Sequence, residues 1–297
     1  RAAHLALAAQ VAAQYFRLRQ LDESIELYTR FIEGSERIRA IYDIRAEENL
    51  VSADVALRQK AEVGRLRREQ QELARERTIV QNGLAALLGL PAGELSLPSA
   101  TLSGIDAPGV PAGLPATLLE RRPDLLAAEF RVLAAYELAG QARLDRLPSI
   151  ALTGSGGSSS DALNGLLSNW LLGVGPSINI PLFDPGKKAQ VKVREADVKI
   201  ASDQYRAAVI RAFQETENAL VNRASRADQL EVARDNVADL RRVQDISQAK
   251  FDEGLVSQLE ILETERSLIQ SEQAALEQQF RLLNDTVTLY KALGGGW

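Results

Sequence analysis

Phe251-Asp-Glu-Gly-Leu-Val-Ser-Gln-Leu-Glu-Ile-Leu262 decides the fold, because its Gly254 is the only glycine within residues 187–293. The chain has 297 residues and ten prolines, none of which lies in that range. Glycine and proline are the main helix breakers, so the sequence predicts one helix over residues 187 to about 250 and a second over 257–293. At 1.5 Å per residue the first would be roughly 95 Å long, far beyond the usual globular helix of about 11–12 residues.

Apolar residues recur at every seventh position along the second helix. The preceding helix carries the same alternation of three-residue and four-residue steps. Heptads of this kind pack helices side by side, so the two helices are expected to form an antiparallel hairpin that turns at Gly254. The pattern consists of Leu262, Ile269, Leu276, Leu283 and Tyr290, with Phe280 and Val287 at companion positions, and of Leu230, Ala233, Val237 and Leu240 on the preceding helix.

The N-terminal part follows the same plan 205 positions earlier. Residues 1–48 read as a helix, Asn49-Leu50-Val51-Ser52 interrupt it, and residues 53–88 resume it. A constant offset at several anchors predicts an internal repeat of two helical hairpins. The anchors are Arg1-Ala2-Ala3 with Arg206-Ala207-Ala208, the first turn with Gly254-Leu255-Val256-Ser257, and Leu88-Gly89 with Leu293-Gly294.

Between the repeats the sequence changes character. Residues 90–117 are rich in turn formers, and Pro123 suits the first turn of a helix that runs to about Leu147. From Pro148 the apolar period becomes two, which is typical of β-strands. Even-numbered positions are apolar, whereas the odd-numbered positions between them are mostly small or polar. The apolar set is Ile150, Leu152, Trp170, Leu172, Val174, Ile178, Ile180 and Leu182.

Both strand runs have a length that suits a tilted membrane-spanning strand of roughly 9–11 residues. No run of about 18 apolar residues is present, so strands are the expected route of this chain across a bilayer. Two strands alone would leave their edges unsatisfied in lipid, so they must join strands of other subunits or of a preceding part of the protein. Trp170 has the character of an interfacial membrane anchor, and the alternative is a core aromatic.

The composition argues against several functions. The formal net charge is −5 with acidic and basic residues interleaved, so no nucleic-acid partner is expected. There is no cysteine, His4 is the only histidine, and no glycine-rich loop is followed by the Lys-Ser/Thr of a phosphate-binding motif. We therefore expect no catalytic residue, no metal site and no cofactor, and the protein is not predicted to be an enzyme.

Five motifs are spread over most of the chain. They are Leu118-Leu119-Glu120-Arg121-Arg122-Pro123-Asp124 with Ala127 and Glu129, Leu147-Pro148-Ser149-Ile150, Gly175-Pro-Ser-Ile-Asn-Ile-Pro-Leu-Phe-Asp184, Phe213-Gln214-Glu215, and Leu289-Tyr-Lys-Ala-Leu-Gly-Gly-Gly-Trp297. Together they resemble the outer membrane factor family, the TolC-like channels of tripartite efflux systems, and specifically its drug-efflux lipoprotein branch. The resemblance implies that an N-terminal portion with a lipidated cysteine and a first strand pair precedes Arg1.

The resemblance also implies a homotrimer in the bacterial outer membrane. Each subunit would contribute strands to a shared barrel in the membrane, and the long helices would form a periplasmic α-barrel. Similar channels export drugs, toxic metals or other small molecules passively. The implied partners are a periplasmic adaptor protein, an inner-membrane efflux transporter that supplies the energy, and outer-membrane lipid, and most of the chain is expected in the periplasm.

The expected fold is mainly α, with long antiparallel helical hairpins, an inserted transmembrane β-hairpin and a mixed equatorial region. The expected parts are residues 1–89, the periplasmic hairpin of the first repeat; 90–123, an equatorial linker; 124–147, a helix leading to the membrane; 148–184, the transmembrane β-hairpin with its external loop; and 185–297, the hairpin of the second repeat with the C-terminal equatorial end.

The two turns form the first candidate site. In similar channels such tips meet the adaptor, so adaptor contact is expected here, and the alternative is that these residues only form turns. Asn and Gly tolerate the backbone of a tight turn, and Ser can cap the helix that follows. The residues are Asn49, Leu50, Val51, Ser52, Gly254, Leu255, Val256 and Ser257.

Leu259, Glu260 and Glu263 follow the second turn directly. They align with the constriction and acidic ring of the periplasmic aperture in similar channels, where the family commonly has Asp. Threefold symmetry would bring three copies of each near one axis, and rings of carboxylates favour cations. The alternative is a solvated helix face. Arg121 and Arg122 are expected to make a structural contact at the start of their helix.

A soluble coiled-coil scaffold or adaptor protein without a membrane role is the competing interpretation. It explains the long helices and the heptads. It does not explain the alternating strands expected at residues 149–155 and 170–183.

Overall fold

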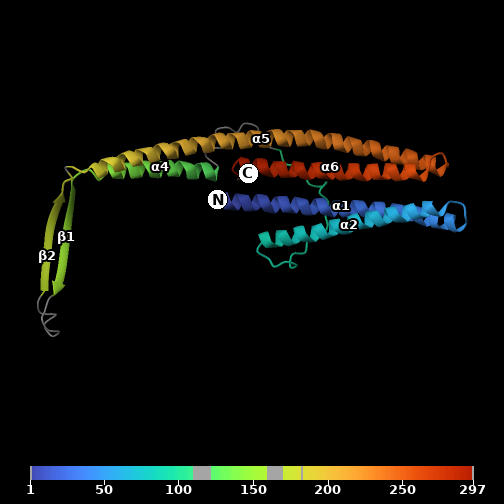
Figure 1. Ribbon diagram of the computed structural model, residues 1–297, viewed down its shortest axis with the longest axis horizontal. Helices are drawn as coiled ribbons and strands as arrows, with labels where there is room; N and C mark the ends of the chain where they lie inside the picture. The colour runs from blue at the N-terminus through green and yellow to red at the C-terminus, as the bar shows by residue number, and fades with distance from the viewer. Residues whose placement is uncertain (1, 110–121, 159–169, 182, 296–297) are drawn as a thin grey trace. The chain divides into compact units, whose positions relative to one another are not determined.

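The computed structural model describes residues 2–109, 122–158, 170–181 and 183–295 (Figure 1). Contacts within the chain divide it into two compact units. The first is Arg1–Arg122 with Ala212–Trp297, and the second is Pro123–Arg211. The longest helix, α5 (Pro185–Asp252), contributes residues to both units.

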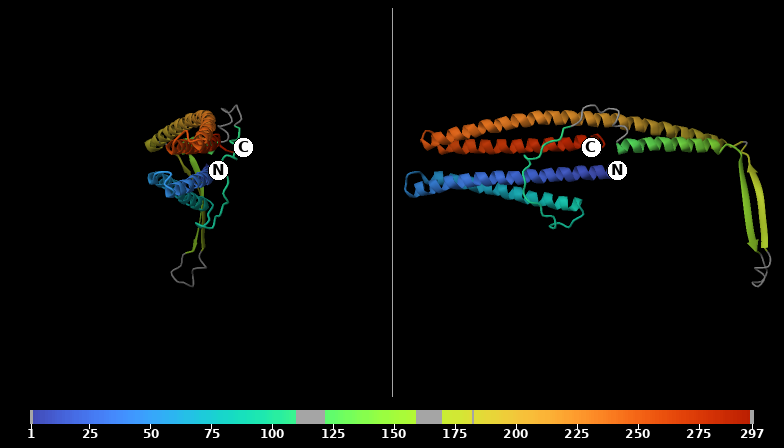
Figure 2. Two further views of the ribbon diagram at one scale, coloured as in Figure 1. Left: turned by 90° about the vertical axis from the view of Figure 1, so that its right-hand side faces the viewer. Right: turned by 180° about the vertical axis from the view of Figure 1, so that it is seen from behind.

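Long helices that run side by side make up the first unit (Figures 1 and 2). Helix α1 (Ala2–Glu47) packs against both α2 (Ala53–Leu87) and α6 (Gln258–Ala292), and residues 212–252 of α5 lie along α6. Their apolar stripes face one another because burial removes them from water. The core where α1, α2 and α6 meet consists of Tyr28, Ile32, Leu66 and Ile269, with Phe31 and Leu73 packed against it. The predicted mainly α fold with two long hairpins is confirmed.

The helices of the two hairpins end in one shared backbone motif. One residue with a positive φ, between 58° and 87°, follows the last turn of each helix. These residues are Asn49, Gly89, Gly254 and Gly294. At all four, the N–H of this residue bonds to the carbonyl three residues back, and the next N–H bonds to the carbonyl five residues back. This is the Schellman motif, which requires a left-handed residue and therefore favours Gly or Asn. The repeat inferred from the sequence thus extends to the hydrogen bonding of the backbone.

In the second unit, helix α4 (Pro123–Leu144) runs beside residues 185–211 of α5. Arg143 and Glu195 form an ion pair at 2.7 Å between the two helices. Small side chains on the buried face of α4 let the helices approach closely. These are Ala128, Ala135, Ala139 and Ala142.

A two-stranded antiparallel sheet completes the second unit (Figure 1). Strand β1 (Ser149–Ser158) pairs with β2 (Trp170–Asn179), so that Ser149 lies opposite Asn179 and Ser158 opposite Trp170. The inserted β-hairpin is therefore confirmed. No helix in the described ranges has a stretch both long and apolar enough to cross a bilayer.

Two elements of the second unit end earlier than expected, and proline explains both. Helix α4 ends at Leu144 rather than Leu147, because the residue before Pro148 is driven out of the helical region. Strand β2 ends at Asn179 rather than at residue 183, because Pro181 has no N–H to donate to a neighbouring strand. The expected continuation of the alternation to Leu182 lies outside the described residues.

Candidate functional site

The two turns lie at the same end of the first unit (Figures 1 and 2). The side-chain amide of Gln258, just past the second turn, donates to the amide oxygen of Gln59 in α2 at 3.0 Å. The rings of Tyr42 and Phe251, on the helices that precede the turns, have centroids 6.4 Å apart. The structure therefore brings together two segments that lie about 200 positions apart in the sequence.

Both turns present an apolar, exposed tip. Leu50 and Leu255 occupy matching positions of the repeat and are each 68% exposed. The valines that follow them, Val51 and Val256, are half-buried. With this exposure, neither turn depends on its leucine for its own packing.

The serines that follow the turns do not cap the helices as expected. Ser52 and Ser257 occupy N-cap positions with extended backbone, but neither side chain makes a capping hydrogen bond. The Ser52 side chain instead hydrogen-bonds with the Asp54 carboxylate, which lowers the pKa of that carboxyl. At the second turn, the Ser257 carbonyl accepts the N–H of Glu260 at 3.1 Å and so starts the helix. The expected side-chain caps are absent at both serines.

Gly254→Ala should lower the free energy of unfolding by about 1 kcal/mol, because a side chain is strained at a φ of 73°. Gly64 is a matched control, since it lies inside α2 with open space where a Cβ would stand. Gly64→Ala should raise the free energy of unfolding by about 0.5–1 kcal/mol. Urea denaturation followed by helical circular dichroism measures both, and destabilisation of the same size at both positions would contradict the left-handed turn.

The residues of the expected aperture lie in the first two turns of α6. Leu259 is 54% exposed. Glu260 is half-buried and Glu263 is exposed. Within the described ranges neither carboxylate forms an ion pair, whereas Glu277 further along α6 pairs with Arg281 at 2.7 Å. Among the described residues, the two carboxylates near the turn therefore lack a salt-bridge partner, and Glu263 interacts with Arg266 only through its charge.

Helix α6 also has a buried polar row that sequence reasoning did not recognise. Three residues after each of four apolar heptad positions stands a buried polar side chain, and we call these four the polar seam. Buried polar groups need partners. Glu272 accepts from Arg241 of α5 at 2.5 and 2.8 Å, and the Gln279 amide donates to the carbonyl of Leu102 at 3.0 Å. The polar seam consists of Glu265, Glu272, Gln279 and Thr286.

Another buried glutamate, Glu62 of α2, lies near the polar seam. Arg65 and Arg266 each place a guanidinium nitrogen 2.6 Å from its carboxylate. Burial alone would raise the pKa of Glu62, but hydrogen bonds from the two arginines and their positive charges outweigh it and lower the pKa to about 2. Glu62 stands four residues before the core residue Leu66, and Glu265 stands four residues before the core residue Ile269. This spacing puts both glutamates on the apolar face of their helices, and it was the signal in the sequence that could have identified them as buried.

Charged residues fasten the segment that follows α2. Asp22 is buried and accepts from Arg19 at 2.9 Å and from Arg77 at 2.5 Å. The same arginines donate to the carbonyls of Pro98 and Leu97 at 2.6 and 3.0 Å. The segment belongs to the linker expected at residues 90–123, of which 110–121 lie outside the described residues.

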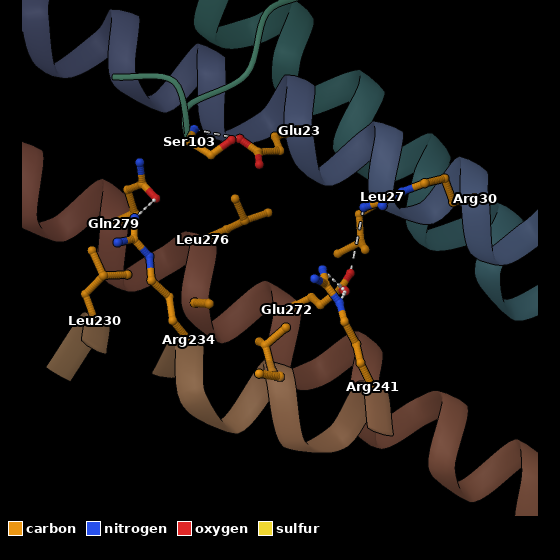
Figure 3. A pocket seen from close by; sticks show the side chains of 13 residues that line it. Glu23, Leu27, Arg30, Ser103, Leu230, Arg234, Arg241, Glu272, Leu276 and Gln279 are labelled. Atoms are coloured by element: carbon orange, nitrogen blue, oxygen red, sulfur yellow. Dashed lines mark hydrogen bonds and ion pairs between the residues drawn. The ribbon is translucent and has the colours of Figure 1, made fainter. Parts of the chain in front are cut away.

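A hollow of about 390 Å³ lies between α1, α5 and α6 (Figure 3). Glu272 lines it and faces Arg241 and, at 3.8 Å, Arg30. On the side of α1, Glu23 accepts the backbone N–H of Ser103 at 2.9 Å. These charged groups are already bonded to one another and to the backbone. Their contacts hold the helices together around the hollow, so we assign it no ligand.

Arg122 makes a structural contact in the first unit. Its buried guanidinium donates to the carbonyl of Ala292 at 3.1 Å and to the carboxylate of Glu215 at 2.7 Å. These bonds tie residue 122 to the end of α6 and to α5. Arg121 lies outside the described residues.

The strand pair has one apolar face. Side chains two residues apart share a face, and the register sets even-numbered residues of β1 opposite even-numbered residues of β2. Trp170, at the start of β2, lies on this face and is exposed. The other apolar members are also exposed, namely Ile150, Leu152, Leu172, Val174 and Ile178. A face of this size, open to the surroundings, requires an apolar medium or a partner.

Long helical hairpins with an inserted apolar strand pair define the class of outer-membrane efflux channels, and comparison with known proteins agrees. The family model of outer membrane efflux proteins matches residues 114–295. The chain is 33% identical to the solvent efflux pump outer membrane protein SrpC of Pseudomonas putida, over all of this chain and 64% of that protein. The chain belongs to the outer membrane efflux protein family, and the resemblance stated from its motifs is confirmed.

Solved structures show the same fold. The open state of the Neisseria gonorrhoeae MtrE outer membrane channel superposes with a TM-score of 0.87 at 31% identity, covering 99% of this chain and 67% of that one. A crystal structure of CusC superposes with a TM-score of 0.89 at 27% identity, covering 100% and 70%. The chain thus spans somewhat less than two thirds of its Pseudomonas relative and about two thirds of these channels.

Proposed function

We propose that this protein is the outer-membrane channel of a tripartite efflux pump, acting as a homotrimer and as a passive duct for drugs or other small molecules. The observation that carries the proposal is the combination of an exposed apolar strand face with helices of 35 to 68 residues. A soluble helical scaffold has no use for such a strand face. A channel needs both parts, one for the membrane and one for the periplasm.

The strand edges support the trimer. Among the described residues, β1 and β2 pair only with each other, so each leaves one edge open. Open edges are costly in lipid because their N–H and C=O groups lack partners. Further strands from other copies of the protein satisfy them, and a closed arrangement of this kind encloses a path through the membrane.

The same reasoning assigns each part of the chain to a compartment. Within residues 148–184, the paired strands β1 and β2 lie in the outer membrane with their apolar face toward lipid and Trp170 at an interface, and the loop between them is external. Residues 124–147 lead to this hairpin. The hairpins of residues 1–89 and 185–297 form the periplasmic α-barrel, and residues 90–123 belong to the equatorial region around it.

The partners follow from the exposed tips. SrpC is named as the outer membrane protein of a solvent efflux pump. This protein likewise works with an inner-membrane transporter that supplies the energy and with a periplasmic adaptor. The adaptor contacts the turns 49–52 and 254–257, where Leu50 and Leu255 give it two apolar points per subunit.

Leu259, Glu260 and Glu263 form the periplasmic aperture in the trimer. Replacing both glutamates by Gln should abolish the cation preference of single channels, because it removes six negative charges from one constriction. The reversal potential across a salt gradient measures the preference. Glu277→Gln on the same helix is a control that should leave it unchanged, and a double variant with undiminished selectivity would sink the assignment.

Detergent dependence tests the proposal against a soluble scaffold. The channel should sediment with membranes, require detergent for extraction and migrate as a trimer in analytical ultracentrifugation. A protein that stays in buffer without detergent while keeping its helical spectrum would contradict the proposal.

A further inference from the structure

The carboxyl group of Glu265 is buried where α1, α2 and α6 meet, close to the two turns. The residue is 6% exposed. The hydroxyl of Ser35 in α1 lies 3.2 and 3.3 Å from the two carboxyl oxygens and donates to them. The carbonyl of Ser35 in turn accepts the side-chain amide of Gln59 in α2 at 3.0 Å. Glu265 is therefore part of one polar contact that joins both hairpins.

Charged groups surround Glu265, but none is bonded to it within the described residues. Arg65 and Arg266 are bonded to Glu62, and Arg241 is bonded to Glu272. A hollow of about 380 Å³ borders Glu265 on the side of α5. The charged groups that face it are Arg30 and Arg37 from α1, Glu62 and Arg65 from α2, Arg241 and Asp245 from α5, and Arg266 and Glu272 from α6.

These surroundings favour the neutral form of the carboxyl. Burial raises the pKa of Glu265 to about 7; the Ser35 hydroxyl opposes the rise, the negative charge of Glu62 adds to it, and Arg65 and Arg266 oppose it. Ionisation would place a second carboxylate near Glu62, and the two arginines that act on both glutamates, Arg65 and Arg266, are already bonded to Glu62. An ion buried without its own partner destabilises the packing around it.

We propose that Glu265 is a pH-sensitive latch: its neutral carboxyl holds α1, α2 and α6 together beside the turns, and its ionisation loosens that contact. The latch goes beyond the proposed channel function, because it concerns the packing of the two hairpins within one chain. Its test therefore stands or falls separately from any measurement of transport.

The contact must loosen as the pH rises. A carboxyl whose pKa is higher in the closed packing than in water, where a Glu titrates near 4.5, binds its proton more tightly when closed. The stabilisation of the closed form by this proton is complete below pH 4.5, and it is lost progressively as the pH rises to about 7. Glu62 has the opposite sign, since its stabilisation is lost only as the pH falls toward 2. Between pH 5.5 and 7.5 the opening equilibrium constant should rise about 20-fold.

A single buried thiol can report this opening, because the chain has no cysteine. Val63→Cys nearly conserves side-chain volume beside Glu62, at a position that is 2% exposed. The labelling rate of this thiol with a dithiopyridine reagent is divided by the labelling rate of a cysteine in a short peptide at the same pH. When the contact closes faster than the thiol is labelled, this ratio is proportional to the opening equilibrium constant. We expect the 20-fold rise with Glu265 present and a flat profile in Glu265→Gln, which has the shape of the neutral carboxyl.

Three variants separate a latch from a merely structural contact. Ala85→Cys, fully buried at the other end of α2, should give a profile that does not depend on Glu265. Ser35→Ala should move the midpoint of the profile to higher pH, and Glu62→Gln should move it to lower pH, because each removes one influence on the carboxyl. A flat profile with Glu265 present, or an equally steep one in Glu265→Gln, would overturn the latch. If Glu265→Gln does not fold, the opposite midpoint shifts decide, and unmoved midpoints count against it.

Discussion

Asp22→Ala should lower the free energy of unfolding by about 3–5 kcal/mol, the cost of leaving buried charge without its partner. Asp22 and Arg19 are both almost fully buried and lie 2.9 Å apart, and Arg77 binds the other carboxylate oxygen. Removing the carboxylate leaves Arg19 with the Pro98 carbonyl as its remaining hydrogen-bond acceptor. It also frees the backbone N–H of Ala100, which bonds to Asp22 at 3.4 Å. The loss is therefore expected to release the segment after α2 as well as to weaken α1.

Urea denaturation followed by circular dichroism measures this effect. Asp43→Ala is a matched control in the same helix, because Asp43 pairs with Arg39 at 3.2 Å on the surface. Exposed ion pairs contribute about 1 kcal/mol or less. If the two variants lose equal stability, the Asp22 cluster does not fasten the linker as described.

Leu255→Asp and Leu50→Asp should each abolish efflux while leaving the trimer intact. Both leucines are exposed at the turns, so the substitution changes no core contact. In a docked tip, however, a carboxylate would be buried without a partner, which costs about 2–5 kcal/mol and weakens adaptor binding at least tenfold. The measurements are the drug tolerance of cells that carry each variant and the cross-linking yield with the adaptor.

Leu255→Met is the control, because it keeps the apolar surface of the tip and should keep efflux. The trimer and the outer-membrane level of each variant are measured alongside, so that misassembly is recognised. Full drug tolerance with Asp at both tips would show that the turns do not contact the adaptor and only reverse the direction of the chain.

The sequence was sufficient to predict the long elements. Heptads and the isolated Gly254 predicted the second hairpin, the 205-residue offset predicted the first, and period-two alternation predicted the strands. These features follow from local rules, namely helix breaking, side-chain periodicity and the need for a left-handed residue at a Schellman turn. The ends of three elements were misjudged by a few residues. Proline explains those at Leu147 and beyond Asn179, whereas β1 runs on to Ser158 instead of ending at residue 155.

Polar groups were harder to predict because their roles depend on partners far along the chain. Glu62 lies 204 positions from Arg266, and Glu265 lies 230 positions from Ser35. In the sequence alone, these two glutamates cannot be told from the solvated glutamates that helices commonly carry. The expected serine caps were absent for a related reason, since the Ser52 side chain bonds with a neighbouring carboxylate in place of the backbone.

We expect the polar seam to set the register of the helical packing. Apolar heptads alone permit neighbouring helices to slide by one repeat, since every repeat offers a similar surface. A slip by one repeat would separate Glu272 from Arg241 and Glu265 from Ser35. Such a device matters in helices of this length, because an error in register would displace both turns.

Conductance across a planar lipid bilayer tests the central claim most directly. The purified protein should produce discrete, long-lived current steps without any nucleotide, pump or adaptor, and each step should correspond to one trimer. Protein that remains monomeric in buffer and leaves the bilayer silent would contradict a passive outer-membrane channel.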